Sequence, residues 1–241
     1  DPDAHAWRRR LAGSLIRTSN LALARGQLVQ AQQDARESLR LLQPLAALQP
    51  DNVAWRRDLA HAYAQAGWVA ALDGHAGDAA QQLARAQQTM AELLQQAQPL
   101  PEWQWLDAVI ALRMQAARAP PLAQDFAPIV ARLETLHRAK PDEVVGISAL
   151  AQALVWHGEQ RAAASDDTGA RTAWQRALAV LGKDAGNSRD KNLLDPWIRA
   201  HVHLGQRTAV TQQLGWLYQA GYRHPGFVSL YAPLFKGQDK S

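Results

Sequence analysis

Two pairs of neighbouring side chains have residue types that could do chemistry. His201 and His203 carry imidazoles of the kind that bind metal ions, and Asp166 and Asp167 form a carboxylate pair of the kind used in acid–base catalysis. Two residues apart on a helix, the histidine rings point about 200° away from each other and cannot share one metal ion. The aspartates stand directly before a predicted helix, where carboxylates cap free backbone N–H groups. We therefore predict structural roles for all four side chains.

The remaining histidines and the absence of familiar motifs lead to the same expectation. No glycine-rich phosphate loop, Gly-x-Ser-x-Gly elbow or His-Glu-x-x-His motif occurs in the chain. The other six histidines are scattered without metal-ligand spacing, at His5, His61, His75, His137, His157 and His224. We predict no catalytic residue, no metal and no cofactor, and we keep an enzyme with an unfamiliar site as the third hypothesis.

Composition favours a helical protein without a concentrated charge. The 241 residues are 47% hydrophobic and rich in Ala, Leu, Gln and Arg, which all favour helix. The 26 basic and 22 acidic residues leave a net charge of +4, spread along the chain, so we do not expect a nucleic-acid partner. The chain contains no cysteine, which excludes disulfides, zinc–thiolate sites and cysteine nucleophiles.

The chain also lacks a run of about 18 apolar residues, so we expect no insertion of this chain into a membrane. It begins at Asp1, and its only methionines are Met90 and Met114. We expect it to be a piece of a larger protein.

The chain contains an internal repeat, which predicts how its helices are arranged. The segment Ala6-Trp7-Arg8-Arg9-Arg10-Leu11-Ala12 returns as Ala54-Trp55-Arg56-Arg57-Asp58-Leu59-Ala60, with six of seven positions matched at an offset of 48 residues. A third tryptophan stands 48 residues further on, at Trp103. We predict that Trp7, Trp55 and Trp103 pack between repeats. A fixed period of this kind is typical of stacked helical repeats.

Small residues at helical spacing indicate how the helices of one repeat pack. The second unit has Tyr63, Gly67 and Ala70, a glycine at 74, and then Ala79, Leu83 and Ala86; the segment from Leu154 and Gly158 to Ala170, Trp174 and Ala177 has the same pattern. Small side chains let two antiparallel helices approach closely. We predict units near 1–50, 51–100, 101–140 and 141–182, with a loop and a C-terminal helical cap over 183–241.

Capping signals set the expected helix boundaries. Asp1, Asp51 and Asp142 are candidate N-caps, and Asp195-Pro196 is typical of a cap followed by proline at the first helical position. Glycines 26, 74 and 221 are candidate helix ends. We predict helices over 2–24, 28–48, 52–72, 76–97, 102–118, 122–139, 142–163, 168–182, 195–204 and 206–220, and a short one after Pro225.

The pattern of residues 50–59 resembles a known repeat family. It reads Pro50-Asp51-Asn52-Val53-Ala54-Trp55-Arg56-Arg57-Asp58-Leu59, which is similar to the start of the extended, Trp-anchored tetratricopeptide repeats of bacterial signalling proteins. The resemblance covers residues 1–100 and 141–182 best. It implies an all-α, right-handed solenoid of paired antiparallel helices.

A second resemblance concerns the segment Gly221-Tyr222-Arg223-His224-Pro225. Such an ending on a tetratricopeptide array is similar to the C-terminal regions of bacterial transmembrane Ser/Thr protein kinases and of membrane-anchored winged-helix regulators. The resemblance implies a helical-repeat region outside the cytoplasm, behind one membrane helix. No kinase motif occurs in this chain.

In tetratricopeptide proteins the first helices of successive repeats line a concave groove, and their equivalent positions here provide a candidate ligand site. These positions are Gly13, Ile16, Asn20 and Ala24; His61, Ala64, Trp68 and Leu72; Val109, Leu112 and Ala116; and Gln152, Val155 and Glu159. Such a mostly apolar groove suits a peptide or a helix, and Asn20, His61, Trp68, Leu72, Gln152 and Glu159 are the residues we select. The alternative for Trp68 is packing against a neighbouring helix.

A second candidate surface is basic. Arg9, Arg10, Arg56 and Arg57, together with Arg8, cluster on the early turns of two adjacent first helices. They could bind an acidic partner, or they could be a solvated helical face.

The leading hypothesis is a non-catalytic sensor or scaffold module that binds a protein or peptide, in the periplasm as part of an inner-membrane signalling protein. The second is a cytoplasmic adaptor that assembles a protein complex. A homodimer is compatible with both.

Overall fold

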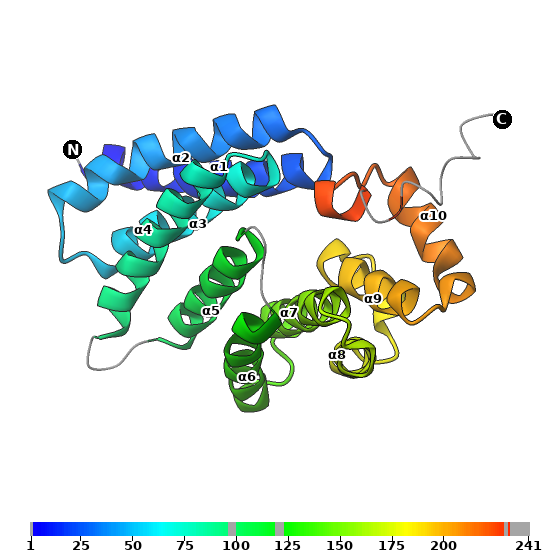
Figure 1. Ribbon diagram of the computed structural model, residues 1–241. Coiled ribbons are helices and arrows are strands. Elements are labelled where there is room, and N and C mark those ends of the chain that lie inside the picture. The colour runs from blue at the N-terminus through cyan, green and yellow to red at the C-terminus, as the bar shows by residue number, and fades with distance from the viewer. Residues whose placement is uncertain (1, 96–99, 119–122, 229–230, 232–241) are drawn as a thin grey trace. The chain divides into compact units, whose positions relative to one another are not determined.

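The computed structural model describes residues 2–95, 100–118, 123–228 and 231, and these contain helices and no strands (Figure 1). The chain divides into two compact units, of which the first comprises residues 1–98 and 221–241 and the second residues 99–220. Helices of the first unit are α1 (Pro2–Ala24), α2 (Leu28–Leu48), α3 (Val53–Leu72) and α4 (Ala76–Leu94). They pack as consecutive pairs, α1 with α2 and α3 with α4, and α2 also packs against α3.

The second unit continues the pairing. Its elements are α5 (Pro101–Ala116), α6 (Ala123–Ala139), α7 (Val144–Ala163), α8 (Asp167–Leu181), the 3-10 turn η1 (Ala185–Asn187), α9 (Lys191–His203), the 3-10 turn η2 (Arg207–Val210) and α10 (Thr211–Gln219). The most extensive packing joins α7 to α8, and α6 packs against α7. The predicted all-helical fold is confirmed for the described residues. None of their helices has the length and apolar character needed to cross a membrane.

The turns between helices have one geometry at Gly26, Gly74 and Ser165, and it recurs after α9 at Gly205, where the Gln206 N–H donates to the His201 carbonyl at 2.9 Å. Gly26, Gly74 and Ser165 all have left-handed backbone conformations, with φ of 71°, 81° and 62°. At each turn the next residue donates its N–H to a carbonyl five residues earlier, and all three N···O distances are 2.9 Å; the bonds are Gln27 to Ala22, His75 to Ala70 and Asp166 to Arg161. This is the Schellman motif, which satisfies the last carbonyls of a helix. The repeat read from the sequence therefore exists in the backbone.

The crossing point of each pair shows the same equivalence in side chains. Ser19, Gly67 and Gly158 occupy matching positions on the first helices, and Ala35, Leu83 and Trp174 lie at the matching positions on the second. A Cβ on Gly67 would lie 2.7 Å from Cγ of Leu83, and a Cβ on Gly158 would lie 2.3 Å from Nε1 of Trp174. Because the helices are close at this point, a larger residue on one requires a smaller one on the other.

The three tryptophans of the 48-residue repeat have different environments. Trp55 is half-buried and packs against a cluster that includes Ile16, Leu42 and Leu45, and Trp103 is buried. Trp7 is 57% exposed, so the prediction that it packs between repeats is wrong for this residue. In the part of the chain that the structure describes, no element covers this face of α1.

Several predicted caps require correction. Helix α3 begins after Asn52, whose side chain accepts a hydrogen bond from the Trp55 N–H, and not after Asp51. Helix α7 begins after Glu143 in place of Asp142, and Asp1 lies outside the described residues. These shifts are of one residue, within the range in which helix ends are defined.

The start of α9 differs more. Asp190 caps this helix through the Asn192 N–H, so Pro196 lies inside the helix and not at its first position. Asp195 is buried and pairs with Arg199 one turn later, which explains why it is unavailable as a cap.

The C-terminal segment packs onto the first unit. The Arg223 N–H donates to the carbonyl of Ala24, the last residue of α1, at 2.6 Å, which satisfies one of the carbonyls that a helix end leaves free. Gly221 has a φ of 75°, as its predicted helix-ending role requires, and residues 225–228 are helical. Phe227 and Tyr231 are buried.

Candidate functional site

The predicted groove residues of the first unit lie at the edge of a core. Trp68 and Leu72 are half-buried and pack against a cluster formed by Ala22, Leu23, Ala31, Ala35 and Val69. His61 is exposed and Asn20 is half-buried. Trp68 thus makes the packing contact of the alternative interpretation while part of its surface remains accessible to a ligand.

The apolar members of the predicted stripe are not at the surface. Ile16, Ala64, Leu112 and Val155 have between 0% and 3% of their surface exposed. A side chain without accessible area cannot contact a ligand, so the expectation of a mostly apolar lining is wrong at these positions. The accessible residues are the more polar ones, together with Trp68 and Leu72.

In the second unit Gln152 and Glu159 both lie on α7 and are half-buried. The side-chain nitrogen of Gln152 is buried without a hydrogen-bond acceptor among the described residues. Glu159 is engaged internally, because its Oε1 lies 3.0 Å from Nε2 of His203 and 3.7 Å from a guanidinium nitrogen of Arg199. The buried nitrogen of Gln152 is not accessible to a ligand in this conformation, so neither residue presents a free polar group at the surface.

The same carboxylate belongs to a polar network that joins α7 to α9. Arg199, with 7% of its side chain exposed, lies between Glu159 and Asp195. His203 stacks on Trp174 of α8, with ring centroids 4.6 Å apart and an interplanar angle of 9°. Charges removed from water are stable only when they are paired and hydrogen-bonded, as these are. The network holds α7, α8 and α9 together.

The two neighbouring histidines have separate partners. His203 contacts Glu159 and Trp174, while Nδ1 of His201 lies 2.6 Å from the side-chain oxygen of Gln206. His201 also packs edge-on against Trp197. The rings diverge as the two-residue spacing predicts. Among the described residues no group of three His, Cys, Asp or Glu side chains could hold a metal ion.

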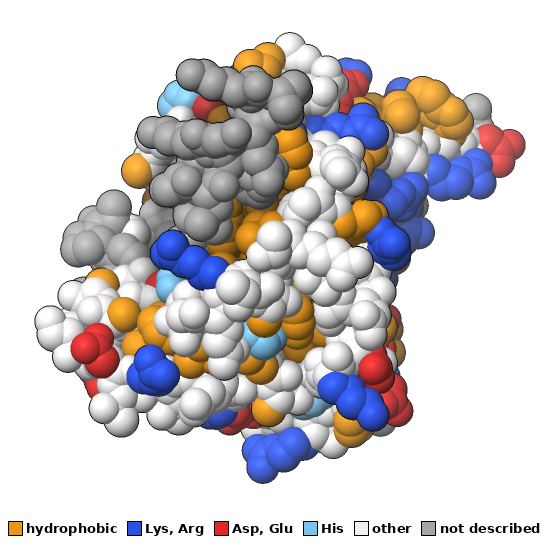
Figure 2. Space-filling view, turned by 90° about the vertical axis from the view of Figure 1, so that its right-hand side faces the viewer, with side chains coloured by type: hydrophobic (Ala, Val, Ile, Leu, Met, Phe, Trp, Pro, Cys, Tyr) orange, Lys and Arg blue, Asp and Glu red, His pale blue; other side chains and the backbone are white. Residues whose placement is uncertain are grey.

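Most of the predicted basic patch is neutralised within the first unit. Arg9 and Arg57 both pair with Asp58, at 2.5 and 2.6 Å, and Arg56 pairs with Glu92. Arg10 is exposed and forms no ion pair with a described carboxylate. On the face shown in Figure 2, basic and acidic side chains occur together among uncharged ones. Three of the four selected arginines are therefore engaged in ion pairs within the first unit, and Arg10 is not.

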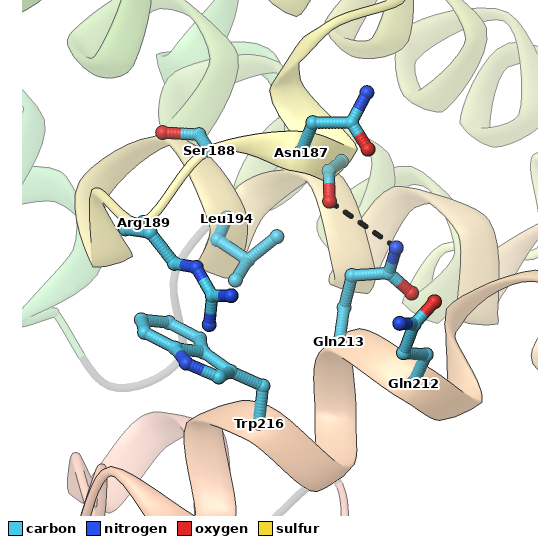
Figure 3. A pocket seen from close by; sticks show the side chains of 8 residues that line it. Asn187, Ser188, Arg189, Leu194, Gln212, Gln213 and Trp216 are labelled. Carbon is cyan, nitrogen blue, oxygen red and sulfur yellow. Dashed lines mark hydrogen bonds between the residues drawn. The ribbon is translucent and has the colours of Figure 1, made fainter.

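A pocket of about 170 Å³ lies in the second unit, between the η1 region, α9 and α10 (Figure 3). Its lining residues are Gly186, Asn187, Ser188, Arg189, Leu194, Gln212, Gln213 and Trp216. Pockets for drug-sized ligands usually have about 300–1,000 Å³, so this one has room for a small molecule or a single side chain.

Polar groups converge on this pocket. The Arg189 guanidinium lies over the Trp216 ring, 4.6 Å from its centroid, and the Gln213 amide donates to the Gly186 carbonyl at 3.2 Å (Figure 3). The side-chain oxygen of Gln213 is buried and has no donor among the described residues. The pocket offers a cation and an apolar wall, which suits binding. It contains no nucleophile beside a general base, so it does not support catalysis.

No sequence pattern predicts this pocket. Its residues all lie in the segment 183–241, which is predicted to form a loop and a helical cap outside the repeat, so no period connects Arg189 with Trp216. The available signal was an arginine in a loop rich in Gly, Asn and Ser, which alone predicts only a turn.

Comparison with known proteins adds no assignment. The chain matches no protein-family model and no curated protein. The function must therefore be argued from its own residues and their arrangement.

Proposed function

We propose that this chain is a non-catalytic module that binds a protein or peptide, built as a right-handed, tetratricopeptide-like solenoid. The observation that carries the proposal is the recurrence of one helix-pair geometry. The Schellman turns at Gly26, Gly74 and Ser165 are alike in φ and in hydrogen bonding, although one of them lies in the other compact unit. Stacked helix pairs give extended surfaces, and binding is the usual task of such surfaces.

The ligand site of this proposal lies on the first helices. Trp68 packs on the cluster of α1 and α2 and is only half-buried, and His61, two turns earlier on the same helix, is exposed. A tryptophan anchored in this way is a common energetic centre of an interface, because its rigid ring loses little entropy on binding. Asn20 and Leu72 of the same unit provide further contacts. In the second unit Gln152 and Glu159 have weaker claims, since the Gln152 nitrogen is buried and Glu159 already contacts His203 and Arg199.

The biological setting of the proposal rests on resemblance. The Pro50–Leu59 pattern and the Gly221–Pro225 ending support a sensor or scaffold region of a bacterial signalling protein, located outside the inner membrane. A cytoplasmic adaptor is the second candidate. Fusing a reporter that works only in the cytoplasm after Ser241 of the full-length protein separates them, because reporter activity there contradicts the sensor assignment.

A binding experiment tests the module itself. A displayed peptide library is selected on the immobilised chain, and the enriched peptides are measured by fluorescence anisotropy against the wild type and Trp68→Ala. We expect the variant to weaken binding by about tenfold or more, because truncating a central aromatic anchor costs at least about 1.4 kcal/mol.

The matched control is Leu48→Ala, which shortens an apolar side chain on α2 that is 58% exposed and lies outside the proposed site. Its affinity should equal that of the wild type. Unchanged binding by Trp68→Ala, or a loss of melting temperature that accounts for its weaker binding, would contradict the proposed site.

A further inference from the structure

The first helix of the second pair has one face covered by the preceding pair. Five residues of α3 form this face: Trp55, Asp58, Ala62, Gln65 and Val69. Asp58 pairs with Arg9, Gln65 donates to Ser19 at 3.0 Å, and Val69 lies in the cluster with Ala22 and Leu23. This face is therefore the surface on which one helix pair stacks against another in the first unit.

The matching face of α7 is covered in the same way in the second unit. Its residues are Gly146, Ala149, Ala153, Trp156 and Gln160, each 91 positions after its counterpart in α3. A Cβ on Gly146 would lie 2.5 Å from the Trp105 ring of α5. Ala149 and Ala153 belong to a core cluster with Trp105 and Phe126. Two first helices thus bury the same stripe against a preceding pair.

The described residues leave the corresponding stripe of α1 uncovered. Its residues, 48 positions before those of α3, are Trp7, Arg10, Ser14, Arg17 and Leu21. At about 100° per residue they fall within an arc of roughly 80°, so they share one face. Trp7 is 57% exposed and Leu21 44% exposed, and Arg10 and Arg17 are exposed as well. We call these five residues the α1 stripe.

We propose that the α1 stripe is a docking surface for an acidic amphipathic helix of a partner protein. Trp7 and Leu21 lie about 21 Å apart along the helix, at 1.5 Å per residue, and provide an apolar anchor at each end. Arg10 and Arg17 lie between them, and neither forms an ion pair with a described carboxylate. A matching helix presents apolar residues to the two anchors and carboxylates to the two guanidinium groups.

The covered face of α3 combines the same two kinds of contact, an apolar one and an ion pair. There, too, a tryptophan begins the stripe and an ion pair crosses it, between Arg9 of one helix and Asp58 of the other. In α1 the position of Asp58 is taken by Arg10, and that of Gln65 by Arg17. Because Arg10 stands where α3 has an aspartate, the α1 stripe favours an acidic partner face, whereas the α3 stripe favours a basic one.

The charge also argues against a second copy of this chain. Two α1 stripes placed face to face would bring arginines of one copy against arginines of the other. Ser14 at the centre is uncharged and cannot compensate; its hydroxyl donates to the Arg10 carbonyl at 3.1 Å and accepts from Arg17 at 3.0 Å. Like charges juxtaposed in an interface disfavour association.

The test uses the complete chain and two synthetic helical peptides. Both peptides carry apolar residues spaced to meet Trp7 and Leu21, and they differ only in having glutamates or lysines between these anchors. We expect the glutamate peptide to bind at least about tenfold more tightly at low salt, and the advantage to shrink as salt is added. Equal affinity of the two peptides would overturn the proposal.

Variants locate the binding. The double substitution Arg10→Ala and Arg17→Ala should remove the preference for the glutamate peptide, and Trp7→Ala should weaken both peptides. The control Arg36→Ala removes an exposed arginine from α2 and should change nothing. Trp68→Ala should also leave this binding intact, which separates failure of this proposal from failure of the proposed groove.

Sedimentation of the wild type and Leu21→Asp completes the test. A monomer at the concentrations used for binding is expected. A dimer that Leu21→Asp dissociates would show that a second copy covers the α1 stripe, and the proposal of an acidic partner would then be wrong.

Discussion

Helix α3 packs closely against α4, and α7 packs closely against α8, but different residues meet at the two crossing points. The first opposes Gly67 to Leu83, and the second opposes Gly158 to Trp174, whose indole N–H also donates to the Val155 carbonyl at 3.3 Å. In the α1–α2 pair the crossing residue is Ser19, whose hydroxyl donates to the Ala31 carbonyl at 2.8 Å opposite a small Ala35. The comparison shows that the residue on the first helix is small at all three crossings, whereas the residue opposite it varies from Ala to Trp.

The largest loss of stability is expected at the crossing of α7 with α8, where the Trp174 ring fills the space opposite Gly158. Trp174→Ala should lower the free energy of unfolding by about 3–5 kcal/mol, because it leaves a cavity and removes the surface on which His203 stacks. Leu83→Ala at the first crossing should cost about 2–5 kcal/mol. Urea unfolding followed by circular dichroism measures both. If Trp174→Ala were near neutral, the proposed equivalence of the two crossings would fail.

Adding a methyl group to the crossing glycines should have the next largest effect. Gly67→Ala and Gly158→Ala are each expected to cost about 1–3 kcal/mol, because the new Cβ would overlap Leu83 or the Trp174 ring and force the helices apart. Gly77→Ala is the control, since a Cβ there meets nothing within 4 Å. It should be neutral or stabilise the fold by less than about 1 kcal/mol.

The coupling between crossing partners sharpens this comparison. Trp174→Leu makes room for a methyl group at position 158, so the double variant with Gly158→Ala should be more stable than the sum of the two single effects predicts. Strict additivity in the double-mutant cycle would show that the two residues do not share one space.

The Schellman turns at positions 26, 74 and 165 differ in the atoms that lie near the turn residue. Gly74→Ala should cost about 1–2 kcal/mol, because only the left-handed backbone opposes it. Gly26→Ala should cost more, since its Cβ would also lie 2.8 Å from the Arg223 carbonyl oxygen. Ser165→Gly should stabilise the α7–α8 turn by up to about 1 kcal/mol. Equal costs at positions 26 and 74 would indicate that the C-terminal segment does not pack on the α1 end.

A smaller effect is expected at the residues that follow these turns. Gln27, His75 and Asp166 are equivalent N-caps with similar backbone angles, but only Asp166 accepts a hydrogen bond with its side chain, from the Gly169 N–H at 2.9 Å. Gln27→Asp should therefore add a cap worth roughly 1 kcal/mol to α2. Gln27→Leu is the control and should not stabilise. A gain for both variants would indicate a cause other than capping.

The features that recur with the repeat could be predicted from the sequence. Gly67, Gly158 and Trp174 stand at matching positions, so their packing followed from the period, and the helix ends at positions 26 and 74 followed from glycine. The exposure of Trp7 could not be predicted, because burial depends on what covers a position and not on its residue type.

Outside the repeat, several residues competed for the same role. Both Asp190 and Asp195 are good caps by type, and the pairing of Asp195 with Arg199 decided the choice in a way that only the tertiary structure shows. The pocket of Arg189 and Trp216 brings together two segments that no sequence pattern connects.

The last comparison concerns the residue that precedes each crossing glycine, Ala66 in α3 and His157 in α7. His157 is buried, and its Nδ1 has no hydrogen-bond partner among the described residues. Burial lowers the pKa of His157, and Arg161 and Arg176 lower it further. Since the folded pKa is below the unfolded one, the contribution of His157 to stability is complete above about pH 6.5 and is lost as the pH falls through the folded pKa.

We therefore expect the wild type to lose stability between about pH 7.5 and 5.5, and His157→Gln to lose less over the same interval. The physical reason is that the unfolded chain takes up a proton which the folded site, with two arginines near it, disfavours. Urea unfolding at the two pH values measures the difference for each variant. The comparison variant is His75→Gln, which removes an exposed histidine at a turn, and its loss of stability is measured beside that of His157→Gln. If His157→Gln and the wild type lose equal stability, the pH dependence does not arise from His157. The crossing of α7 with α8 would then be no more sensitive to acid than the crossing of α3 with α4.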